Sequence, residues 1–121
     1  MADIVPPPSR LYIAGPMTGL PEFNYPAFRE AEAQLRALGY GVLNPVNAED
    51  HNPTPGVPQE WDWYMRHALR MVLEADALAV LPNWWKSRGA MLEVQVATAL
   101  GMPVEPVAHW RVIGEAVPRG A

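Results

Sequence analysis

The chain has 121 residues, of which 50% are hydrophobic and 18% are charged, and this composition predicts one folded domain with a single hydrophobic core. The net charge of -4 argues against nucleic acid polymers and anionic membranes as partners, because both are bound by clusters of Lys and Arg. The chain has no cysteine and no apolar run near the ~20 residues of a membrane helix, so we expect a cytoplasmic protein without disulfides or a cysteine nucleophile.

The first part of the chain predicts a leader, a strand and a helix. Residues 1–9 contain three consecutive prolines and no periodic pattern, so we expect an extended leader before a domain over residues 10–121. Residues 10–14, RLYIA, predict a strand. Asn24 is a favourable N-cap, and apolar residues follow it at helical spacing until Gly39, which predicts the first helix.

The middle of the chain repeats this alternation. Residues 40–45, YGVLNP, predict a short strand, and the polar, proline-rich residues 46–58 predict a loop. A second helix is expected over about residues 59–74, where apolar side chains recur on one helical face. Residues 76–82, DALAVLP, form a continuous apolar run, which is typical of a central strand covered on both faces.

The last predicted elements are a helix and a strand. The loop NWWKSR, residues 83–88, is followed by a helix that ends near Gly101, and residues 102–107, MPVEPV, predict the final strand. Strands that alternate with helices imply βαβ units. We therefore predict an α/β fold, a single three-layer domain with a parallel sheet of four or five strands in flavodoxin-like or Rossmann-like order.

Two loops hold the candidate ligand site, because open parallel sheets bind ligands beyond the carboxyl ends of their strands. GPMTG follows the first strand, and NWWKSRG follows the central strand. Gly15, Gly19 and Gly89 can let the backbone approach an anion, and plain tight turns are the alternative interpretation. The spacing fits neither a nucleoside triphosphate P-loop nor a dinucleotide fingerprint.

Glu93 stands in an otherwise apolar stretch of the third predicted helix. A carboxylate there remains ionised only if N–H donors, the helix dipole or a hydroxyl offset its lost hydration, and Tyr12 on the first strand can supply the hydroxyl. An oriented and partly dry carboxylate suits nucleophilic attack on an anomeric carbon, as in retaining glycosyl transfer. The alternative is a solvated Glu93 beside Gln95 on an exposed part of the helix.

Several segments together resemble the nucleoside 2-deoxyribosyltransferase superfamily over about residues 10–107. They are YIAGPMTG, Asn24 followed by PAF, W..YM, and ADALAVLPNWWKSRGAMLEVQVATALGMPV. The most specific part is Ser87-x-Gly89-x-x-x-Glu93 after the buried strand, and the likeness is strongest to small phage and bacterial members. The superfamily includes transferases that exchange bases on deoxyribose and hydrolases that cleave the N-glycosidic bond of nucleoside 5′-monophosphates.

The resemblance implies a role for individual residues. Glu93 falls at the nucleophile that bonds to the sugar C1′, and Tyr12 falls at the tyrosine that orients it. Gly15 matches a glycine of the first loop, and Ser87 matches a serine that contacts the 5′-phosphate in the monophosphate hydrolases. The resemblance thus implies a nucleotide or nucleoside ligand, with a nucleotide favoured, a homodimer or larger homo-oligomer, and no cofactor.

The chain departs from the family pattern on the second helix, where Ala68 takes the place of the usual Asp. The carboxylate expected to protonate the leaving base is therefore missing. Tyr64 shares the face of position 68 and His67 titrates near neutrality, so either is a candidate acid. A core aromatic residue and a solvated histidine are the respective alternatives.

The chain also departs from the pattern in the first loop, where Thr18 stands in place of an Arg of the nucleotide hydrolases. Backbone N–H groups of this loop can still bind an oxyanion, and Arg88 or Lys86 can add positive charge from the opposite loop, a solvated basic loop being the alternative. The candidates for substrate and phosphate binding are Gly15, Met17, Thr18, Gly19, Asn24, Ser87, Arg88 and Gly89.

Trp84 and Trp85 follow the central strand, where a ring can stack on a base or form a dimer contact. His51 and His109 have no partners at metal-ligand spacing, so we assign no metal. The leading hypothesis is cleavage or base exchange at the N-glycosidic bond of a nucleoside 5′-monophosphate through a covalent Glu93–sugar intermediate. The alternative is a catalytically weakened protein that senses or sequesters a nucleotide, and a third possibility is an interaction module that uses the tryptophans.

Overall fold

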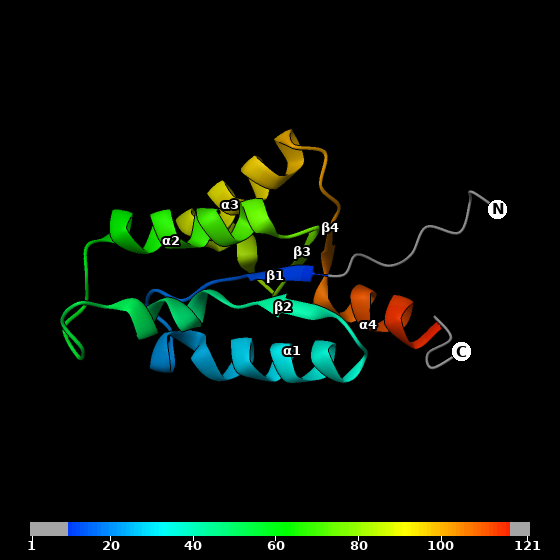
Figure 1. Cartoon of the computed structure of the whole chain (residues 1–121), viewed down its shortest axis with the longest axis horizontal. Coiled ribbons are helices and arrows are strands. Elements are labelled where there is room, and N and C mark those ends of the chain that lie inside the picture. The colour runs from blue at the N-terminus through cyan, green and yellow to red at the C-terminus, as the bar shows by residue number, and fades with distance from the viewer. Residues whose placement is uncertain (1–9, 117–121) are drawn as a thin grey trace.

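Four strands form one parallel sheet in the order β2-β1-β3-β4. The computed structural model describes residues 10–116, and Figure 1 shows the arrangement. The strands are β1 (Arg10–Ala14), β2 (Gly41–Leu43), β3 (Ala77–Val80) and β4 (Val104–Pro106). This order is the beginning of the flavodoxin-like arrangement, so the predicted fold class, sheet and strand order are confirmed.

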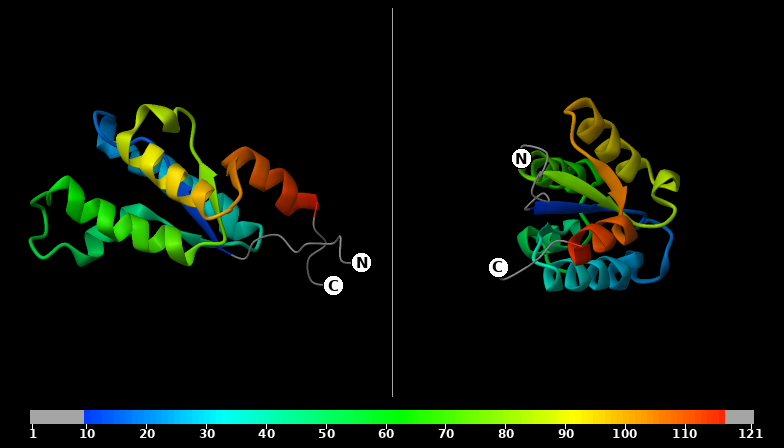
Figure 2. Two further views of the ribbon diagram at one scale, coloured as in Figure 1. Left: turned by 90° about the horizontal axis from the view of Figure 1, so that it is seen from above. Right: turned by 90° about the vertical axis from the view of Figure 1, so that its right-hand side faces the viewer.

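Helices cover both faces of the sheet and complete the three predicted layers. α1 (Tyr25–Ala37) and α4 (Val107–Ala116) lie on one face, and α2 (Trp61–Glu74) and α3 (Arg88–Ala99) lie on the other (Figures 1 and 2). Both strands in the middle of the sheet are buried, and all four residues of β3 are inaccessible or nearly so. The apolar run of β3 is therefore explained as predicted: helices cover both faces of this strand.

The two faces of β1 supply two separate hydrophobic cores. Leu11 and Ile13 pack with Phe28 and Leu35 of α1 on one side of the sheet. Tyr12 and Ala14 point to the other side, where they pack with small and branched residues of α2 and α3. Because side chains alternate along a strand, this register fixes Tyr12 on the face that carries α3.

The order in which strands are added to the sheet reverses between β1 and β3, and this reversal places the candidate ligand site. The chain moves from β1 to β2 on one side and then crosses to β3 on the other side of β1. Such a reversal opens a crevice at the carboxyl ends of the two central strands. The loops after β1 and β3 border that crevice, as the sequence predicts.

Four segments for which the sequence predicts no helix are helical, and two of them are the short 3-10 helices η1 (Pro21–Asn24) and η3 (Trp84–Lys86). Residues 46–58 were expected to be a loop, but Pro45–His51 form a 3-10 helix, η2, which buries Val46 and Ala48. The Asn44 side chain starts this helix by accepting a hydrogen bond from the Val46 N–H at 3.1 Å.

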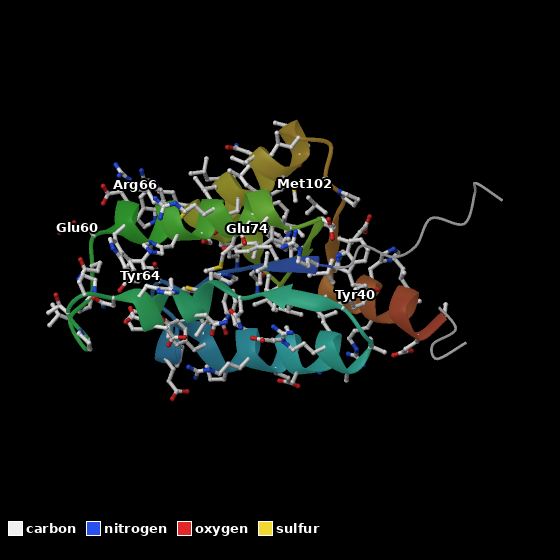
Figure 3. All side chains as sticks on the ribbon, viewed as in Figure 1. Tyr40, Glu60, Tyr64, Arg66, Glu74 and Met102 are labelled. Atoms are coloured by element: carbon white, nitrogen blue, oxygen red, sulfur yellow. The ribbon has the colours of Figure 1, made fainter. Side chains whose placement is uncertain are left out.

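The other unpredicted element is α4, for which the sequence analysis proposed no helix. Its Trp110 is buried, and the indole N–H donates to the Leu78 carbonyl at 2.8 Å. The Tyr40 hydroxyl in turn donates to the Trp110 carbonyl at 2.8 Å, and Tyr40 lies beside α4 in Figure 3. Contacts with distant residues therefore hold this short helix against the sheet.

Asn24 precedes α1 as expected, but it does not cap the helix with its side chain. Its backbone is left-handed, with φ 61°, and its amide donates to the Pro16 carbonyl at 3.0 Å instead. The predicted leader, residues 1–9, lies outside the described residues. Among residues 10–116, no helix is both long and apolar enough to cross a membrane.

Candidate active site

A large cavity opens where the carboxyl ends of β1 and β3 meet. Its volume is about 1430 Å³, and its wall includes residues from the loop after β1, the 3-10 helix η2, the start of α2 and the start of α3. This volume exceeds that of typical small-molecule pockets, which are about 300 to 1,000 Å³. It therefore has room for a nucleotide-sized ligand.

Glu93 lies on the cavity wall and forms a buried hydrogen bond with Tyr12. Glu93 is 6% exposed and Tyr12 is inaccessible, and the Tyr12 hydroxyl donates to Glu93 Oε2 at 2.6 Å. The interpretation of Glu93 as a solvated surface residue is therefore wrong. The predicted contact between this hydroxyl and this carboxylate is present.

Burial and the tyrosine act in opposite directions on Glu93. Burial raises the pKa of Glu93 from 4.5 to about 7, although the hydrogen bond from Tyr12 lowers it. Burial, followed by the nearby Glu93, raises the pKa of Tyr12 well above its usual value, so this hydroxyl remains a neutral donor. At neutral pH the site thus contains a carboxylate that titrates in the physiological range beside a fixed donor.

The start of α3 brings Glu93 to the cavity. Ser87 is the N-cap, and its Oγ accepts from the Ala90 N–H at 3.1 Å. Gly89 allows close packing on α2, because a Cβ atom there would lie 3.1 Å from Met65 Sδ. The buried residues of α3 are Ala90, Glu93 and Ala97, so Glu93 lies on the helix face that packs on the sheet.

The loop after β1 forms another part of the wall. A Cβ atom at Gly15 would lie 2.8 Å from the Leu81 side chain, so glycine is needed there to let the two strand-end loops pack together. Met17, Thr18 and Asn24 also line the cavity. Gly19 is outside the cavity wall, and its left-handed φ of 83° serves the turn.

Basic and hydroxyl side chains lie at the start of α3. Lys86, Ser87 and Arg88 all line the cavity. The Arg88 guanidinium carbon is 3.9 Å from the centre of the Trp61 ring, a cation–π distance that holds this charge at the wall. The Ser87 oxygen accepts its capping bond and still has its hydrogen to donate. These groups, with the helix N-terminus, can bind an anion.

The two predicted acid candidates have different positions. Tyr64 lines the cavity and donates its hydroxyl hydrogen to Glu49 Oε1 at 2.6 Å. His67 is outside the cavity wall, where its ring packs on Trp63 at 4.1 Å between centroids. Tyr64 lies one turn before Ala68 and shares its face toward the site, whereas His67 is adjacent to Ala68 and points about 100° away from that face.

Trp84 and Trp85 do not line the large cavity. They border a separate apolar pocket of about 170 Å³, and their rings meet edge to face at 6.0 Å. Neither ring is therefore on the wall of the large cavity, where the expected stacking on a base would take place; both lie at the 3-10 helix Trp84–Lys86, η3. The dimer contact, and the homodimer or larger assembly, stay predictions.

Sequence analysis missed several residues of the wall, among them Glu49, Gln59 and the aromatic rings of Phe23, Tyr25 and Trp61. Glu49 had one available signal, since it follows the carboxyl end of β2 within a few residues, where ligands bind in such sheets. The assignment of residues 46–58 to a plain loop hid it. Among residues 10–116, no group of three or more His, Asp or Glu side chains is placed to hold a metal ion.

The fold and the cavity define a flavodoxin-like α/β protein with a candidate ligand site where the strand order reverses. Residues 9–105 match the family described as "Domain of unknown function (DUF4406)", and the chain belongs to this family. No match is found among curated proteins.

A solved structure with the same fold is a 2-deoxyribosyltransferase from the psychrotolerant bacterium Bacillus psychrosaccharolyticus, described as a biocatalyst for the synthesis of antiviral and antitumoral nucleosides. It superposes with a TM-score of 0.60 at 24% identity, over 78% of this chain and 69% of the other. The resemblance stated from the sequence is thereby confirmed for the fold.

Replacing Glu93 tests its burial directly, because the Glu93 carboxyl group binds its proton more tightly in the folded chain than in the unfolded chain. Between about pH 4.5 and pH 7 the folded chain holds more protons, so stability falls as pH rises through this window and stays lower above it. We expect Glu93→Gln, which keeps an acceptor for Tyr12, to raise the free energy of unfolding by ~2 kcal/mol more at pH 8 than at pH 5. Urea unfolding at both pH values measures this difference.

The matched control is Glu74→Gln at the exposed end of α2, which should change stability equally at both pH values. An equal effect of Glu93→Gln at pH 5 and pH 8 would show that the carboxyl group titrates normally.

Proposed function

We propose that this protein cleaves or exchanges the N-glycosidic bond of a nucleoside 5′-monophosphate, with Glu93 as the nucleophile. The observation that carries the proposal is the 2.6 Å hydrogen bond between Tyr12 and a buried Glu93 on the wall of a nucleotide-sized cavity. A tyrosine that donates to one carboxylate oxygen holds the group in place and leaves the other oxygen for attack. The fold shared with a 2-deoxyribosyltransferase supports this class of chemistry.

The 5′-phosphate would bind between the loop after β1 and the start of α3. Met17 and Thr18 line the cavity on one side, and Ser87 and Arg88 line it on the other. A hydroxyl, a guanidinium and a helix N-terminus together suit a phosphate dianion. This combination favours a nucleotide over a free nucleoside.

The reaction would proceed by two displacements at C1′. A Glu93 carboxylate oxygen forms a bond to C1′ while the C1′–N bond breaks. The electron pair of the C1′–N bond leaves with the base nitrogen, which takes up a proton. Water, or the nitrogen of a second base, then attacks C1′, loses a proton and releases the Glu93 carboxylate. Water gives hydrolysis and a second base gives transfer.

A second candidate function follows from Ala68. This residue is buried and lines the cavity at the helix position where a carboxylate would be expected. Proton donation to a leaving group is typically worth ~10² to 10⁴ in rate, so its loss can leave a protein that binds the nucleotide without useful turnover. Such a protein would sense or sequester its ligand.

Product analysis separates the two candidates. We expect release of free base from at least one member of a panel of ribo- and deoxyribonucleoside 5′-monophosphates, including modified pyrimidines. Removing the nucleophile in Glu93→Gln should lower the rate by ~10³-fold or more, with Glu74→Gln as the control. Saturable binding without any base release would instead support the nucleotide-binding protein.

The pH dependence of the rate reports on the hydrogen bond from Tyr12. Because attack needs the ionised carboxylate, kcat/KM should rise with pH to a plateau above about pH 7. Tyr12→Phe removes the interaction that lowers the Glu93 pKa, so the rise should move by ~1 pH unit or more to higher pH. An unchanged profile in a folded Tyr12→Phe variant would mean that the titrating group is not Glu93.

Ala68→Asp tests whether the missing carboxylate restricts turnover. A carboxylic acid at this point of the wall should raise the rate by ~10²-fold or more if it meets the leaving base. Burial of the new carboxyl opposes folding, so thermal unfolding should accompany the rate measurement. A folded variant with no gain would show that another group already supplies the proton or that the chain is not an N-glycosidase.

A further inference from the structure

A second glutamate–tyrosine pair lies on the wall of the same cavity. Glu49, on η2, and Tyr64, on α2, both line it, and Figure 3 places Tyr64 between these two segments. Among the described residues of the wall, the carboxylates are Glu49 and Glu93. The reaction proposed above uses Glu93 and leaves Glu49 without a role.

A network of donors fixes the Glu49 carboxylate. Tyr64 donates to Oε1 at 2.6 Å, and the Asn52 amide donates to Oε2 at 3.1 Å. The Tyr64 oxygen accepts from the Gln59 backbone N–H at 3.2 Å. The Asn52 carbonyl oxygen accepts from the Gln59 side chain at 2.8 Å. The partners of Glu49 are therefore themselves held by further hydrogen bonds.

Counting acceptor positions shows what the network leaves available. A carboxylate has about four lone-pair positions, two on each oxygen, and the hydrogen bonds from Tyr64 and Asn52 occupy one on each oxygen of Glu49. Each oxygen of the half-buried Glu49 thus has one acceptor position left. The two oxygens of a carboxylate match a planar group that carries two neighbouring N–H donors.

The position of Glu49 suits the base of the ligand. The loop after β1 and the start of α3 supply the groups assigned to the phosphate, and Glu93 is assigned to the sugar carbon. The remaining wall holds Glu49 on η2 with the rings of Tyr25, at the start of α1, and Tyr64, on α2. Aromatic rings and a few oriented polar groups are the usual means of binding a flat heterocycle.

Resting on the function proposed above, we propose that Glu49 selects a base that presents two adjacent N–H donors on one edge, which among the common bases is guanine. Its N1–H and 2-amino groups point the same way, as a carboxylate fork requires. Adenine and cytosine alternate a donor with an acceptor on that edge, and uracil and thymine place their N–H between two carbonyl groups. An acceptor that faces a carboxylate is repelled.

Binding of three 5′-monophosphates to a non-hydrolysing Glu93→Gln background tests the selection. By calorimetry, guanosine monophosphate should bind ~10- to 100-fold more tightly than inosine monophosphate, which lacks the 2-amino donor. Xanthosine monophosphate should bind most weakly, because its 2-oxo group is an acceptor. Equal affinities for the three nucleotides would overturn the proposal.

Adding Glu49→Gln should change the order of affinities, because an amide presents one acceptor and one donor. We expect guanosine monophosphate to lose ~10-fold or more and xanthosine monophosphate to gain. Asp50→Asn is the matched control, since it removes the same charge from the exposed neighbouring residue and should leave the order unchanged. A uniform loss for all three nucleotides in Glu49→Gln would assign Glu49 a structural role only and overturn the proposal.

The two proposals fail separately. Selective binding of guanosine monophosphate without turnover by the parent protein would refute the glycosidase function and keep the role of Glu49. Turnover of nucleotides without discrimination among the three bases would refute the role of Glu49 and keep the glycosidase function. The comparison in the Glu93→Gln background decides the selection even if Glu49→Gln does not fold.

Discussion

The site depends on one buried carboxylate and the hydroxyl that holds it. Glu93 and Tyr12 are separated by 81 positions in the sequence, and they meet because α3 packs on the face of the sheet to which Tyr12 points. Burial of a carboxyl group is unfavourable unless a donor is present, and the Tyr12 hydroxyl is that donor. A one-residue shift in the register of β1 would turn Tyr12 to the α1 side and leave Glu93 without it.

Small residues make this approach possible. Ala14 in β1 and Ala90 and Ala97 in α3 belong to the same buried cluster as Tyr12, so the helix can lie close to the sheet. Gly15 and Gly89 have a similar effect at the two loops, because side chains there would meet Leu81 and Met65. Gly15 thus lets the two strand-end loops pack together, and Gly89 lets α3 pack on α2.

The cavity combines two glutamate–tyrosine pairs in different surroundings. Tyr12 and Glu93 are buried between sheet and helix, whereas Tyr64 and Glu49 are half-buried between η2 and α2 and bonded to further polar groups. The first pair suits chemistry at a carbon atom, since a dry and oriented carboxylate is a better nucleophile than a hydrated one. The second pair suits recognition, since further hydrogen bonds hold the Glu49 carboxylate and its partners in place.

The sequence by itself determined the α/β class, the parallel sheet and the contact between Glu93 and Tyr12. Apolar runs, helical spacing and strand-end glycines are local signals, and a lone carboxylate in an apolar helix is visible without a structure. Only the tertiary structure decided that Glu49 lines the cavity, that Trp84 and Trp85 turn away from it, and that residues 107–116 form a helix. These features depend on contacts between residues far apart in the chain, such as Trp110 with Leu78.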